Sequence, residues 1–230
     1  MQAAPAQMPI EAHGHNHWSP YVDTGGTTLA IAGADYVLVA SDTRQSDGYL
    51  INSRYSPKAF ELANNTVLGT SGCAADCKRL CEVLEQRAQV YRHRHDRQIG
   101  APALAQLLSN TLYSRRMLPY YVFPVLAGLD AEGKGAAYSY DAVGNMLRVT
   151  AVCMGSASAL IQPFLDNQVA FKNQRVPDPD RLLSREEARK IAIDAFTSAT
   201  ERDIYTGDYL EIFVVDAQGV HKETRELKHD

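Results

Sequence analysis

The chain has 230 residues, of which 45% are hydrophobic and 22% are charged. This length and this composition are typical of one globular domain with a single core. The formal net charge of -4 argues against a nucleic-acid-binding protein, because such proteins carry a surplus of positive charge.

Residues 1–18 differ in composition from the rest of the chain and contain the cluster His13-Gly14-His15-Asn16-His17. They lack the basic start and the apolar run of a signal peptide, and they lack the arginine of a transit peptide. We therefore interpret them as a flexible leader before a single domain over residues 19–230. Neutral imidazole is a common metal ligand, but a short histidine tract is more often incidental, so we expect neither a metal nor a cofactor.

The domain begins with a predicted β-hairpin. β-Branched and aliphatic residues fill positions 27–31 after the turn-forming pair Gly25-Gly26, and a second run of this kind covers residues 36–40. Polar residues 41–44 end the hairpin. Shorter strands are expected at residues 49–51, 58–62 and 65–70.

Two amphipathic helices follow these strands. Apolar side chains recur at intervals of three and four residues over positions 74–95, and a second helix is expected over residues 104–112, ending before Pro119. Three cysteines at four-residue spacing share one helix face, namely Cys73, Cys77 and Cys81. One straight helix cannot wrap three ligands around zinc, so we interpret them as small buried hydrophobic residues.

The second half of the chain repeats this order of strands and helices. Residues 120–129 are rich in β-formers, but Pro124 interrupts them, which favours an edge strand or a bulge. A helix is expected from residues 155–158 with a serine as its cap, and Ser184 with Glu187 has the capping-box spacing of another helix. Further strands are expected at residues 136–140, 146–154, 209–215 and 220–224.

The order of these elements predicts the fold class. Strands, a helix pair, strands, a second helix pair and closing strands favour an α+β protein, because each helix pair can cover one face of a sheet. Tight turns between the short strands indicate antiparallel pairing. The prediction is a four-layer αββα sandwich of two antiparallel sheets.

Several motifs, in a fixed order from residue 19 to the last residue, carry a resemblance. They are GGTTLA at 25–30, ASDTR at 40–44, Lys58, GTSG at 69–72 with AADC at 74–77, and ERDIYTGD at 201–208. Together they resemble the β subunits of the eukaryotic 20S proteasome. Within that family, YSRR at 113–116, PYYV at 119–122 and LDNQV at 165–169 resemble the noncatalytic subunit at the sixth position of the β ring.

The resemblance implies several properties that the residues alone do not. It implies the N-terminal nucleophile hydrolase fold and a leader that is a propeptide, part of which is trimmed during assembly. It also implies a place in the cytoplasm and nucleus, in a four-ring particle of 28 α and β subunits that degrades proteins in an ATP- and ubiquitin-dependent way. Neither nucleic acid nor a membrane is an expected partner.

Active members of this family attack peptides with a threonine freed at its own amino terminus. The resemblance places its supporting network at Asp42, Lys58, Ser156 and Asp203, with Thr206 where the family keeps a serine. Gly26 occupies the place of the nucleophile, three residues before Leu29. Glycine has no hydroxyl, so the sequence predicts a chain without a catalytic residue.

The residues of this supporting network allow two interpretations, one catalytic and one structural. Cleavage of the Gly26–Thr27 bond would expose Thr27 as a new terminal threonine, but a shift of one residue along a strand turns the side chain to the opposite face. We therefore expect the Thr27 hydroxyl to point away from Lys58. In the favoured interpretation Asp42, Lys58 and Asp203 form a buried charge network that holds the two sheets together.

Overall fold

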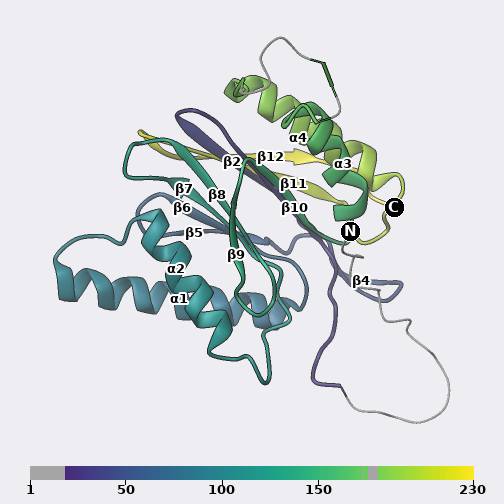
Figure 1. Cartoon of the computed structure of the whole chain (residues 1–230). Coiled ribbons are helices and arrows are strands. Elements are labelled where there is room, and N and C mark those ends of the chain that lie inside the picture. The colour runs from purple at the N-terminus through teal and green to yellow at the C-terminus, as the bar shows by residue number, and fades with distance from the viewer. Residues whose placement is uncertain (1–18, 173, 176–180) are drawn as a thin grey trace.

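The computed structural model describes residues 19–172, 174–175 and 181–230 (Figure 1). The predicted leader at residues 1–18, with its histidine cluster, lies outside the described residues. The elements, in chain order, are β1 (Thr27–Ala32), β2 (Tyr36–Asp42), β3 (Gln45–Asp47), β4 (Leu50–Ser53), β5 (Ala59–Leu62), β6 (Thr66–Gly69), α1 (Ala74–His95), α2 (Ala101–Tyr113), β7 (Val125–Leu129), β8 (Gly135–Tyr140), β9 (Met146–Val149), β10 (Ala151–Gly155), α3 (Ser158–Gln168), α4 (Arg185–Thr200), β11 (Tyr209–Asp216) and β12 (Gly219–Glu226).

Two five-stranded antiparallel sheets form the centre of the molecule. The first has the strand order β10-β1-β2-β11-β12 and the second the order β5-β6-β7-β8-β9. Helices α3 and α4 cover the outer face of the first sheet, and α1 and α2 cover the outer face of the second (Figure 1). A third apolar cluster fills the space between the sheets. The predicted four-layer αββα sandwich is thereby confirmed.

Side chains along β1 point alternately to the two faces of the sheet, and this determines which of them reach the functional site. Leu29 and Ile31 pack in the cluster with α3 and α4, whereas Ala30 packs in the cluster between the sheets. Because successive side chains of a strand point to opposite faces, Thr27 belongs to the helix-facing side. Gly26, one residue earlier, belongs to the side that faces the second sheet.

The helices agree closely with the sequence predictions. Helix α1 begins at Ala74 and ends at His95, and the three spaced cysteines are buried, as expected from their pattern. Helix α4 begins with the predicted capping box, in which Ser184 accepts a hydrogen bond from the Glu187 amide while Glu187 accepts one from the Ser184 amide. Among the described residues, no helix is long and apolar enough to span a membrane.

The start of α3 differs from the prediction. Its N-cap is Ala157, and no side chain caps the helix. Ser156 is the residue before this N-cap, and its hydroxyl donates to the carboxylate of Asp203. The serine that the sequence offers as a cap thus lies one position before the N-cap, and its hydroxyl binds a side chain outside the helix.

Two strand predictions are wrong. Residues 146–154 form two strands in different sheets, β9 and β10, because the chain crosses from one sheet to the other at Thr150. Strand β7 is a central strand between β6 and β8 rather than an edge strand. Pro124 lies just before its first residue, so the missing amide hydrogen of proline removes no hydrogen bond from the sheet.

The capping box of α4 offers a test of the local stability. We predict that Ser184→Ala lowers the free energy of unfolding by about 1 kcal/mol, because the Glu187 amide loses its acceptor. Urea denaturation of the full chain measures this change. Ser198→Ala is the control, since Ser198 lies exposed within the same helix and alanine favours helix there. Equal losses in the two variants would contradict the capping role.

Candidate functional site

Gly26 lies at the place predicted for a nucleophile and faces Lys58. A Cβ atom added to Gly26 would lie 2.0 Å from the Cε atom of Lys58. The backbone of Gly26 has φ of +87°, a conformation that residues with a side chain rarely adopt. Both the space and the backbone at this position therefore suit glycine.

The carboxylate of Asp42 is the centre of the first group of polar contacts. It is fully buried and accepts hydrogen bonds from the amides of Thr27 at 2.8 Å, of Arg44 at 3.2 Å and of Gly207 at 3.2 Å. The Nζ atom of Lys58 lies 3.5 Å from Asp42 Oδ1 and donates to the Asp42 carbonyl oxygen at 3.2 Å. Three amides and one ammonium group thus surround a single buried carboxylate.

Burial shifts both partners of this ion pair toward neutrality. It raises the pKa of Asp42, while Lys58 and the three amide donors act in the opposite direction. Burial likewise lowers the pKa of Lys58, and Asp42 opposes that shift. Each charge therefore depends on the other, because loss of one partner would leave the second buried without compensation.

A second group of contacts collects hydroxyls around Asp203. The hydroxyls of Ser156 and Thr206 both donate to Asp203 Oδ2 at 2.6 Å. The Thr27 Oγ1 atom lies 2.8 Å from Thr206 Oγ1, and the Ala157 amide donates to it at 3.0 Å. The Thr27 hydroxyl therefore points into this group on the helix-facing side, away from the side on which Gly26 faces Lys58.

Thr27 joins the two groups. Its amide donates to Asp42, and its hydroxyl reaches the cluster at Asp203. No ion pair connects Asp203 with Lys58 in the part of the chain that the structure describes. The expected single charge network of Asp42, Lys58 and Asp203 is thus corrected to two groups with Thr27 between them.

Sequence reasoning missed a buried ion pair beside the site. The Arg44 Nε atom lies 2.9 Å from Asp208 Oδ2, and both side chains are almost completely buried. Burial acts to raise the pKa of Asp208, but hydrogen bonds from Arg44 and Arg54 outweigh it and leave the pKa below its ordinary value. The motifs at 40–44 and 201–208 contain these residues, but nothing in the sequence pairs them.

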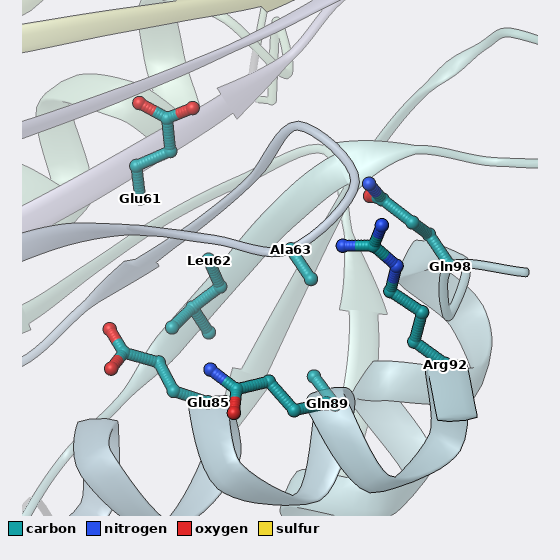
Figure 2. A pocket seen from close by; sticks show the side chains of 8 residues that line it. Glu61, Leu62, Ala63, Glu85, Gln89, Arg92 and Gln98 are labelled. Atoms are coloured by element: carbon teal, nitrogen blue, oxygen red, sulfur yellow. The ribbon is translucent and has the colours of Figure 1, made fainter. Parts of the chain in front are cut away.

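A hollow of about 280 Å³ lies elsewhere, between the β5–β6 turn and α1 (Figure 2). Figure 2 shows Glu85, Gln89 and Arg92 of α1 lining it, with Gln98 beside Arg92 and Glu61 on the opposite wall. None of the residues around Asp42 or Asp203 lines this hollow. The residues that the sequence predicted as a site therefore lie apart from this hollow.

Comparison with known protein families matches residues 22–215 to the family described as "Proteasome subunit". The chain belongs to this family. It is 50% identical to proteasome subunit beta type-1 of Arabidopsis thaliana over 94% of this chain and 98% of that protein. It is 46% identical to the protein of the same name from Drosophila melanogaster, over 94% of this chain and 92% of the relative.

A yeast relative carries a different number in its name. The chain is 45% identical to proteasome subunit beta type-6 of Saccharomyces cerevisiae, over 98% of this chain and 95% of that protein. The recognition from motifs is thereby confirmed. The chain is a β-type subunit of the proteasome core, and its sandwich is the N-terminal nucleophile hydrolase fold.

Because Asp42 and Lys58 form a buried ion pair, we expect their contributions to the free energy of unfolding to be strongly coupled. We expect Lys58→Met to lower the free energy of unfolding by about 3 kcal/mol or more, because it strands a buried carboxylate. The double variant Asp42→Asn, Lys58→Met should lose less than the sum of the single variants. Chemical denaturation of the four proteins gives the coupling energy.

Lys78→Met is the matched control for this cycle. Lys78 is exposed on α1, and its replacement is expected to change the stability by less than about 0.5 kcal/mol. Additive losses at Asp42 and Lys58 would show that the pair is not a unit.

Proposed function

We propose that this chain is a noncatalytic structural β subunit of the 20S proteasome core particle. It supports ring assembly and shapes the proteolytic chamber, next to the other α and β subunits of a 28-subunit particle in the cytoplasm and nucleus. The particle serves ATP- and ubiquitin-dependent protein degradation. The observation that carries the proposal is Gly26, which faces Lys58 where an active subunit has a threonine.

The chemistry of an N-terminal threonine needs a hydroxyl and a basic amine in the same residue. Gly26 has no hydroxyl, so even a free amine at this position would have no nucleophile beside it. Lys58 remains beside this position, but the group that its charge would activate is absent. The retained residues therefore have no nucleophile to serve.

The alternative is a peptidase that uses Thr27 after cleavage of the Gly26–Thr27 bond. Its support is the contact of the Thr27 hydroxyl with Ser156 and Thr206. Three observations weigh against it. Thr27 is completely buried, its hydroxyl lies on the helix-facing side, and the carbonyl oxygen of Gly26 accepts a hydrogen bond from the Ser156 amide at 3.1 Å. A misplacement much smaller than a change of strand face already lowers catalytic rates by orders of magnitude.

The retained polar residues have a structural role that does not need catalysis. The contacts of Asp42 join the start of β1, the end of β2 and the loop that contains Gly207. Lys58 lies directly before β5 of the second sheet, and its contact with Asp42 links that sheet to the first. The network thus holds both sheets and a loop in one arrangement, which supports a structural role for these residues.

Covalent labelling separates the two functions. The particle is treated with an electrophilic peptide that bonds to N-terminal threonines, and the intact mass of each released subunit is then measured. We predict that this chain gains no mass, because it offers no free threonine terminus. The catalytic subunits of the same particle should gain the mass of the label and so provide the positive control. An adduct on Thr27 would establish the peptidase instead.

A further inference from the structure

Residues 21–25, which we name the strap, lie directly before Gly26 and are held by the body of the domain. The Tyr21 hydroxyl donates to the carbonyl oxygen of Pro119 at 2.7 Å. The ring of Tyr21 also packs against that of Tyr121, with 5.8 Å between the ring centroids. The first residue of the strap is therefore anchored to the segment between α2 and β7.

Thr24 is the most strongly held residue of the strap. Its amide and its hydroxyl both donate to the carbonyl oxygen of Gly72, at 3.0 and 2.6 Å. Its own carbonyl oxygen accepts a hydrogen bond from the Ser46 amide at 3.1 Å. The strap thus lies between β3 and the residues that lead into α1.

The start of α1 lacks a cap from its own sequence. The N-cap residue is Cys73, whose side chain makes no capping hydrogen bond. The first amides of a helix have no partner within the helix and need an acceptor from elsewhere. The Ala74 amide donates to the hydroxyl oxygen of Thr24 at 3.0 Å, across 50 positions of sequence.

We propose that Thr24 is the surrogate N-cap of α1, so that its hydroxyl orders the first turn of a helix 50 positions further along the chain. A threonine hydroxyl is a favourable acceptor for the first turn of a helix, and here it comes from a distant segment. The order of the first turn of α1 then depends on residues that precede Gly26. This inference does not depend on whether the chain is catalytic.

Two variants of Thr24 test the proposal by hydrogen exchange on the full chain within the assembled particle. Thr24→Val keeps the shape of the side chain but removes the acceptor, whereas Thr24→Ser keeps the acceptor. We expect the amides of the first turn of α1 to exchange about fivefold faster in Thr24→Val, which corresponds to the loss of one cap. Thr24→Ser should match the wild type, and the amides of α2 should be unchanged in both.

Two results would overturn the proposal. One is unchanged exchange at the start of α1 in Thr24→Val, and the other is equal loosening in Thr24→Val and Thr24→Ser. If Thr24→Val does not assemble, the same exchange is measured in Thr24→Ala, which also removes the acceptor for the Ala74 amide. Faster exchange in the first turn of α1, with α2 unchanged, supports the capping role of Thr24 in that variant, and unchanged exchange there refutes it.

Discussion

The buried carboxylate of Asp42 is the constraint on which the arrangement of this domain depends. A charge without solvent must be surrounded by donors, and Asp42 obtains them from the start of β1, from its own turn, from the loop at Gly207 and from Lys58. Each donor comes from a different part of the chain. The hydrogen bonds to the Asp42 carboxylate therefore hold the two sheets in a fixed arrangement. They also position Thr27, whose hydroxyl contacts the group of hydroxyls around Asp203.

The same arrangement fits the proposed noncatalytic function. At position 26 the backbone turns with a positive φ, and the Lys58 side chain lies where a Cβ would be. Glycine relieves both constraints, and the chain continues upstream as the strap. Lys58 keeps its partner in Asp42, because removing either charge would destabilise the fold whether or not a reaction takes place. Retention of the polar network is thus compatible, in physical terms, with the proposed loss of catalysis.

The sequence predicts those features that are decided locally. The bounds of α1 and the capping box of α4 follow from periodicity and from two residues three positions apart. The opposite faces of Gly26 and Thr27 follow from strand alternation. Features that depend on distant partners could not be read in this way. The division of β9 from β10 at Thr150, the Arg44–Asp208 pair and the capping of α1 by Thr24 join segments that only the fold brings together.

The intact mass of this chain, released from particles purified from its own cells, tests the central claim most directly. The account predicts a subunit whose N-terminus lies upstream of Tyr21, so that the measured mass includes the strap and Gly26. A mature chain that begins at Thr27 would contradict it, because Thr27 would then carry the free amine and hydroxyl of a threonine peptidase.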